Sequence, residues 1–239
     1  MDLARLDPVC QPALRSLDEA LAAFGTQWVS VAGFEEHTAQ KLGGLLEVCV
    51  QQLVASQPAL GADTEALRRL AHAVEAHALR SCQQKTLSVC RESTAAEDAA
   101  ITAVCARIAA TTVAQMLGEG GQKPHEVSVD TLDTVGRLLQ QMEAADLPRE
   151  KSATAQRAWA ALSGHVSSRN LSMDDLLPTW LFATARARLS HLRGDLLYIK
   201  TFSLARNVVP DSPEVEHSIA NLEAAVEFFL AEAESGKWR

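Results

Sequence analysis

Residues 172–178 read Ser-Met-Asp-Asp-Leu-Leu-Pro, in which two adjacent carboxylates lead into an apolar segment with helical spacing. The apolar pattern has already begun when Pro178 interrupts it, and proline is tolerated only in the first turn of a helix. The helix therefore either begins near Leu177, with Asp174 in the turn before it, or begins at Ser172 and bends at Pro178. In both cases Asp174 lies beside a helix amino end, where the helix dipole favours the ionised carboxylate.

The acidic pair also has a purely structural interpretation. Ser172, followed three residues later by Asp175, fits a capping box with Asp in place of the usual Glu or Gln. Acidic residues are common in the first turn of helices because they interact favourably with the helix dipole. From these residues alone helix capping is the simpler interpretation, and a function for the pair needs support from elsewhere in the chain.

Such support comes from three further segments, which together with the acidic pair resemble the Vps-nine (vacuolar protein sorting nine) exchange domain of Rabex, Rin and alsin-like proteins. The family signature reads roughly Ser-Ala-Asp-Asp-hydrophobic-Leu-Pro, and residues 172–178 differ from it at one position. Residues 147–151, Leu-Pro-Arg-Glu-Lys, resemble the Pro-x-x-Lys element of the family. Residues 195–202 resemble its segment that ends in an aromatic, an aliphatic and a Phe, and residues 221–229 its closing helix. The resemblance covers roughly residues 125–235.

The resemblance implies an exchange factor that releases GDP from a small endosomal GTPase of the Rab-five or Rab-twenty-one class. In this family the first Asp of the motif acts as an acidic finger, a role that falls on Asp174. A carboxylate in the nucleotide pocket can pair with the phosphate-binding lysine and repel the phosphates. The implied partner is a GDP-bound or nucleotide-free Rab-type GTPase. The implied location is cytoplasmic, with peripheral recruitment to early endosomes through other proteins.

A second set of residues is predicted to contact the GTPase, because an apolar groove must hold its mobile switch segments. The predicted partner-binding residues are Asp175, Pro178, Trp180, Leu181, Asp195, Tyr198, His217 and Ser218. The spacing of the apolar members is equally that of an ordinary helix core. Pro178 is the exception, since it stands in the family motif itself.

Two positions depart from the family pattern. The family usually carries Gly-Glu-x-Gly-Tyr-Tyr just before its closing helix, whereas residues 211–218 read Asp-Ser-Pro-Glu-Val-Glu-His-Ser. The family Tyr falls on or near Ser218, beside His217, and the family Asn before the aromatic segment corresponds to Asp195. The alternative function is therefore a non-catalytic module that binds or scaffolds a Rab, or another helical partner, without releasing nucleotide.

Composition sets further bounds on the function. The 239 residues carry a formal net charge of −8, so the chain lacks the basic field that nucleic-acid binding requires. No apolar run approaches the roughly 18 residues of a membrane-spanning helix, and the first residues lack a secretory leader, so we expect no transmembrane segment. The five cysteines are scattered without a Cys-x-x-Cys pair, which predicts reduced thiols in the core.

Apolar residues recur at helical spacing along almost the whole chain and predict an all-α fold, a multi-helix bundle. Helices are expected near residues 14–24, 42–53, 64–74, 95–117, 132–142, 148–166, 192–202 and 215–229, and after the acidic motif. Only residues 27–31 alternate like a strand. Glycines at 118–121 predict a boundary. About four helices in residues 1–120 are then expected to pack against a Vps-nine-like core in residues 121–239.

The sequence offers no motif for covalent chemistry. It contains no phosphate-binding Gly-Lys-Ser/Thr loop, no nucleophile elbow and no dinucleotide fingerprint. The histidines are dispersed, and His72 and His77 are five residues apart, about 140° around a helix axis. We therefore expect no metal site and no cofactor.

Overall fold

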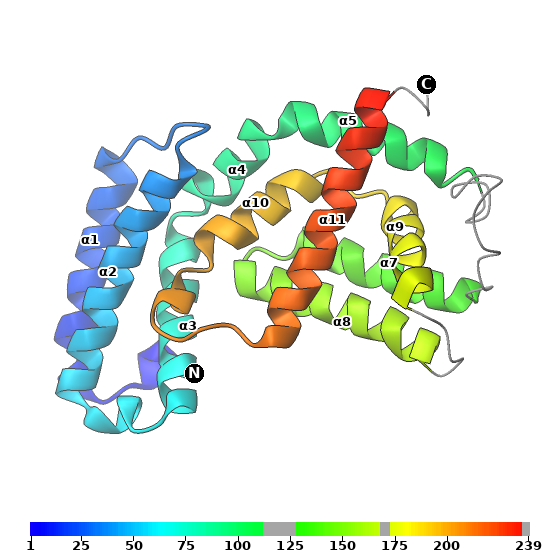
Figure 1. Cartoon of the computed structure of the whole chain (residues 1–239). Helices are drawn as coiled ribbons and strands as arrows, with labels where there is room; N and C mark the ends of the chain where they lie inside the picture. Colours follow the sequence, from blue (N-terminus) through cyan, green and yellow to red (C-terminus); the bar gives the residue numbers. More distant parts are fainter. Residues whose placement is uncertain (112–127, 168–172, 236–239) are drawn as a thin grey trace. The chain divides into compact units, whose positions relative to one another are not determined.

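The computed structural model describes residues 1–111, 128–167 and 173–235, without the side chains at 165–167 and 173–175. Every regular element in these residues is helical, which confirms the predicted all-α fold (Figure 1). The helices are α1 (Gln11–Gln27), α2 (Glu35–Ser56), α3 (Thr64–Ser81), α4 (Leu87–Ser93), α5 (Ala95–Ile108), α7 (Val129–Ala144), α8 (Pro148–Ser167), α9 (Met173–Ala187), α10 (Leu192–Phe202) and α11 (Pro213–Ser235), with 3-10 turns η1 (Leu3–Arg5), η2 (Pro8–Cys10), η3 (Pro58–Gly61), η4 (Gln83–Lys85) and η5 (Leu204–Asn207).

The chain forms two compact units, and each is assembled from segments that are separated in the sequence. Unit 1 comprises Met1–Ser93, Asp146–Arg149 and Leu197–Asp211, and unit 2 comprises Thr94–Ala145, Glu150–Leu196 and Ser212–Arg239. The boundary predicted at residues 120–121 lies outside the described residues. The units nevertheless differ from the two predicted halves, because α5 belongs to unit 2 and residues 197–211 belong to unit 1.

Unit 1 is built around α1, α2 and α3, which pack side by side at the blue and cyan end of the chain (Figure 1). The helix expected near residues 64–74 is present as α3, and the Asp63 carboxylate caps its amino end by accepting a hydrogen bond of 2.6 Å from the Ala66 N–H. Phe202 and Leu204 join the apolar core of this unit, which explains why residues 197–211 belong to it. The strand-like stretch at 27–31 forms no strand.

Unit 2 holds the acidic motif. In this unit α9 packs against α7 and α5, and α11 crosses α5 (Figure 1). α5 supplies Ile101, Val104 and Ile108 to the same apolar core as Trp180 of α9 and Phe229 of α11, so it belongs with them rather than with the helices that precede it. Residues 112–117, which were predicted to extend this helix, lie outside the described residues.

Three remaining predictions concern the whole chain. The five cysteines are all free and buried, as predicted. Among the described residues, no helix is both long enough and apolar enough to cross a bilayer, and no group of three metal-ligating side chains gathers.

The seven-residue helix α4 was not predicted, because it spans too few residues to show a helical period.

Candidate functional site

The acidic motif stands at the amino end of α9, and Pro178 lies inside that helix. The structure therefore selects the alternative in which the helix begins before the proline. Because Pro178 has no N–H, the carbonyl of Asp174 cannot accept the usual hydrogen bond from four residues ahead. Asp174 and Asp175 occupy the first turn of α9, as expected for a position beside the amino end, whereas their side chains lie outside the described residues.

The apolar residues that follow anchor α9 inside unit 2. Leu176 and Trp180 are buried, and the Trp180 indole donates a hydrogen bond of 3.0 Å from Nε1 to the carbonyl of Asn221 on α11. Leu177, the next residue, is by contrast 40% exposed. Pro178 beside it is half-buried. The first two turns of α9 thus combine a fixed inner face with an accessible outer face.

A series of edge-to-face ring contacts runs from the core of unit 2 to its surface. Trp159 of α8 meets Trp180 edge to face, with 5.4 Å between ring centroids. His217 of α11 meets Trp159 in the same manner at 5.5 Å, and His217 is exposed. The second turn of α11, which carries His217, is thereby packed against α8 and α9, the helices that carry the Pro-x-x-Lys element and the acidic motif.

The lysine of that element, Lys151, is the centre of a buried polar cluster. Its Nζ lies 2.9 Å from Oδ2 of Asp195, and both side chains are 0% exposed. Nζ also donates to the carbonyls of Met142 and Glu143 in the last turn of α7, each at 3.0 Å. Lys151 therefore caps the carboxyl end of α7, where a cation interacts favourably with the helix dipole, and ties it to the first turn of α10.

Two further carboxylates cap the amino end of α10. Glu143 accepts hydrogen bonds of 2.5 and 2.7 Å from the N–H groups of Ser190 and His191. Asp98 accepts bonds of 2.7 and 3.1 Å from the N–H groups of Arg193 and Gly194. Burial raises the pKa of Asp98, although these donors oppose the shift.

Neither of these caps was predicted from the sequence. A signal for Asp98 was present, since it lies three residues before Ile101 on the apolar face of its helix. Glu143 gave no comparable signal, because it is half-buried at the end of α7.

Several of the predicted partner-binding residues have buried side chains. Trp180, Asp195, Tyr198 and Ser218 are 0% exposed, and Leu181 is also buried. In unit 1, the Tyr198 hydroxyl donates to the carbonyl of Asp146 at 3.2 Å, and burial raises its pKa. In unit 2, the Ser218 hydroxyl donates to the carbonyl of Val215 at 2.8 Å.

The accessible members of the predicted set are therefore few. Among those with described side chains they are Pro178 and His217. Leu177, which the predicted set left out, is the exposed residue beside Pro178.

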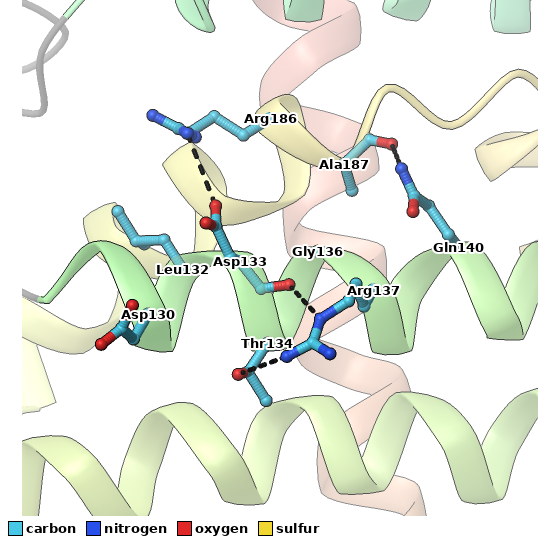
Figure 2. Close-up of a pocket in the computed structure, with 9 residues that line it drawn as sticks. All are labelled: Asp130, Leu132, Asp133, Thr134, Gly136, Arg137, Gln140, Arg186 and Ala187. Atoms are coloured by element: carbon cyan, nitrogen blue, oxygen red, sulfur yellow. Dashed lines mark hydrogen bonds and ion pairs between the residues drawn. The ribbon is translucent and has the colours of Figure 1, made fainter.

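A separate hollow of about 550 Å³ lies between α7 and the carboxyl end of α9 (Figure 2). Its side chains bind one another: Arg186 lies 3.6 Å from Asp133, and Gln140 donates to the carbonyl of Ala187 at 3.1 Å. Twelve residues of helix, roughly 18 Å, separate Arg186 from Asp174. The hollow is thus no part of the site around the acidic motif, and its interactions attach the end of α9 to α7.

Comparison with known protein families connects these features. Residues 132–233 match the sequence model of the Vacuolar sorting protein 9 (VPS9) domain. No curated protein matches the chain. The matched stretch contains the acidic motif, Lys151 and most of α11, but it excludes α5, which completes the core of unit 2. The predicted resemblance is confirmed: residues 132–233 are similar to the VPS9 domain, a domain that in general implies nucleotide exchange on Rab GTPases.

Proposed function

We propose that this protein accelerates GDP release from an endosomal Rab GTPase of the Rab-five or Rab-twenty-one class, with Asp174 as the acidic finger. The observation that carries the proposal is the position of Asp174 in the first turn of α9, within the stretch that matches the VPS9 domain. We also propose that the protein acts in the cytoplasm and reaches early endosomes through other proteins.

The mechanism requires a carboxylate that stays charged and keeps its position. A helix amino end favours the charged form through its dipole, and α9 provides such an end at residue 174. Placed against the phosphate-binding loop of the GTPase, the carboxylate would compete with the phosphates for the loop lysine. The two binding events on the GTPase are thermodynamically linked. The bound exchange factor lowers the affinity for nucleotide by the same factor by which bound nucleotide lowers the affinity for the exchange factor.

The accessible apolar residues of α9 provide the rest of the contact surface. Leu177 and Pro178 follow Asp174 by three and four positions, so the three positions share one face of the helix. Trp180 holds this part of the helix against α11 through its hydrogen bond to the carbonyl of Asn221. A GTPase whose switch segment lies on Leu177 and Pro178 would therefore have its nucleotide pocket beside Asp174.

Release of fluorescent GDP from a panel of Rab GTPases tests the proposal. Wild type should accelerate release from at least one Rab of the two classes, and Asp174→Asn should abolish most of that acceleration because it removes the charge at constant shape. Asp130→Asn is the matched control, since Asp130 is also an acidic residue in the first turn of a helix of unit 2. Acceleration by Asp174→Asn equal to that of wild type, or no acceleration with any Rab, would contradict the proposal.

A second candidate function is a non-catalytic Rab-binding module. The residue at 218 favours it, because a buried Ser stands at or near the place where the resembled family carries Tyr. Binding of wild type to nucleotide-loaded Rab, measured by titration, without faster GDP release would select this alternative.

A further inference from the structure

In unit 1, the connection between α1 and α2 carries apolar side chains that the fold does not bury. Residues 28–34 read Trp-Val-Ser-Val-Ala-Gly-Phe and lie at one end of these two helices (Figure 1). These seven residues are named the α1–α2 tip. Val29 is 78% exposed, Val31 50% and Phe34 60%. Single exposed apolar side chains are ordinary, whereas several in one short segment indicate an interaction site.

The first residue of the α1–α2 tip fixes it to three other elements of unit 1. The Trp28 ring stacks on Phe24 of α1, with 5.7 Å between ring centroids. Its Nε1 donates to Oγ1 of Thr38 on α2 at 3.2 Å. The ammonium group of Lys85, in the turn η4, donates to the Trp28 carbonyl. The α1–α2 tip therefore begins from an anchored position.

The other end of the α1–α2 tip is a turn with a defined backbone. Gly33 has a φ of +84°, which glycine adopts without strain, and its N–H donates to the Glu35 carboxylate at 2.9 Å. The N–H of Phe34 donates to the carbonyl of Val31 at 3.0 Å. Because the backbone that displays Val31 and Phe34 is already ordered, binding through these side chains costs little additional conformational entropy.

The charges around the α1–α2 tip suit an anionic surface. Residues 20–34 contain no charged side chain. On α2, His37 and Lys41 follow Phe34 by three and seven positions, so they share its face of the helix, and both are exposed. Glu36 lies about 160° around the axis from Phe34. Although the whole chain carries a net charge of −8, salt screens charges farther away than about 8 Å at physiological ionic strength, so the local cation dominates.

A lipid bilayer suits the α1–α2 tip better than a second protein does. Three side chains expose far less area than the roughly 800 Å² that a stable protein interface buries on each partner. The interface of a bilayer needs no complementary pocket, and it accepts aromatic and aliphatic side chains at the level of the headgroups. Lys41 lies about 10 Å from Phe34 along the helix axis. Its ammonium group can therefore contact lipid phosphates while Phe34 reaches the acyl chains.

We infer that the α1–α2 tip inserts into the interfacial region of a membrane that contains anionic phospholipid. The exposed side chains of the tip lie at the acyl-chain boundary, and Lys41 lies at the lipid phosphates. The contact is shallow and reversible, because it involves one short segment. It is independent of nucleotide exchange, and it adds a direct lipid contact to the proposed recruitment through other proteins.

Co-sedimentation of the whole protein with phosphatidylcholine vesicles, with and without phosphatidylserine, tests this inference. Wild type should bind the vesicles that contain phosphatidylserine more tightly, and added salt should weaken the binding. Phe34→Ser should lower the apparent affinity about tenfold. Lys41→Gln should remove most of the preference for phosphatidylserine. Val9→Ser is the matched control, because Val9 is 51% exposed and the length of α1, about 25 Å, separates it from the tip.

Fluorescence of Phe34→Trp gives a second readout of insertion. Relative to wild type, its emission should shift to shorter wavelength when vesicles containing phosphatidylserine are added. No vesicle binding by wild type, or equal binding by wild type, Phe34→Ser and Val9→Ser, overturns the inference. Self-association that Phe34→Ser abolishes, without vesicle binding, would assign the tip to a second copy of the chain and also overturn it. The assay contains no GTPase, so its outcome is separate from that of the GDP-release experiment.

Discussion

Lys151 and Asp195 form an ion pair that is completely shielded from water, with 2.9 Å between Nζ and Oδ2. The lysine comes from the first turn of α8 and the aspartate from the first turn of α10, and Nζ also binds the last carbonyls of α7. Three helix ends of unit 2 thus depend on one ammonium group. A residue predicted to bind the GTPase, Asp195, is in this conformation an internal partner of a lysine.

Removal of Lys151 should strongly destabilise the protein. Lys151→Met leaves Asp195 as a buried charge without its ion-pair partner, and a loss of about 3–5 kcal/mol is expected from chemical denaturation. The double variant Lys151→Met with Asp195→Leu removes both charges, so it should recover part of that loss. A loss below about 1 kcal/mol in the single variant would contradict this account of the cluster.

The carboxylate caps of α10 should contribute to stability through buried hydrogen bonds. Asp98→Asn replaces one of the two acceptor oxygens with an NH2 group, so one of the two backbone N–H groups faces a donor, and a loss of about 1–3 kcal/mol is expected. Asp133→Asn is the control, because its ion pair with Arg186 is solvent-exposed and should be worth less than about 1 kcal/mol. Equal losses in the two variants would contradict the assignment of Asp98 as a buried cap.

These polar contacts mark the limit of what the sequence could predict. Helical spacing located the apolar faces of the helices but left open whether Trp180 and Leu181, which were predicted to contact the partner, belong to the core, where the structure places them. The caps of α10 join residues 48 and 95 positions apart, and a local pattern carries no information about such pairs. For the same reason the sequence could not show that Asp195, a predicted partner-binding residue, is buried against Lys151. The position of α5 in unit 2 likewise depends on packing against α9 and α11 rather than on its place in the chain.

In unit 1, Glu75 should make stability depend on pH. It is 3% exposed and accepts a bond of 2.5 Å from the Ala205 N–H. Burial raises its pKa to about 7, and this effect outweighs the opposing hydrogen bond from Ala205. The folded state therefore holds a proton that the unfolded state releases near its ordinary pKa of 4.5, so the stabilisation is complete below pH 4.5 and is lost as the pH rises through about 7.

Denaturant unfolding at several pH values measures this effect. Glu75→Gln cannot titrate, so its free energy of unfolding relative to wild type should increase between pH 4.5 and 7.5, by at most about 3 kcal/mol. A difference between variant and wild type that stays constant over this range would contradict the raised pKa.

His72, three residues earlier on α3, should act in the opposite direction. Burial, reinforced by Arg149, lowers its pKa to about 4 from the ordinary 6.5, and its buried Nδ1 has no hydrogen-bond partner among the residues that the structure describes. Its stabilisation is therefore present above pH 6.5 and is lost as the pH falls through about 4. The free energy of unfolding of His72→Gln relative to wild type should therefore increase as the pH falls from 6.5 to 4. The variant should be closest to wild type in stability, or exceed it, near pH 4. A constant difference from wild type between pH 4 and 6.5 would show that His72 does not titrate as described.

The neighbouring residues Leu176 and Leu177 allow the contact surface of α9 to be separated from its core. Leu176 is 2% exposed, so Leu176→Ala should cost about 2–4 kcal/mol of folding stability through lost burial and a cavity. Leu177 is 40% exposed, and Leu177→Ser should change stability by less than about 0.5 kcal/mol. If Leu177 binds the switch segment of the GTPase, the same variant should raise KM for Rab several-fold, whereas Asp174→Asn lowers the maximal rate. Unchanged exchange kinetics in a fully folded Leu177→Ser protein would place the partner on another face of unit 2.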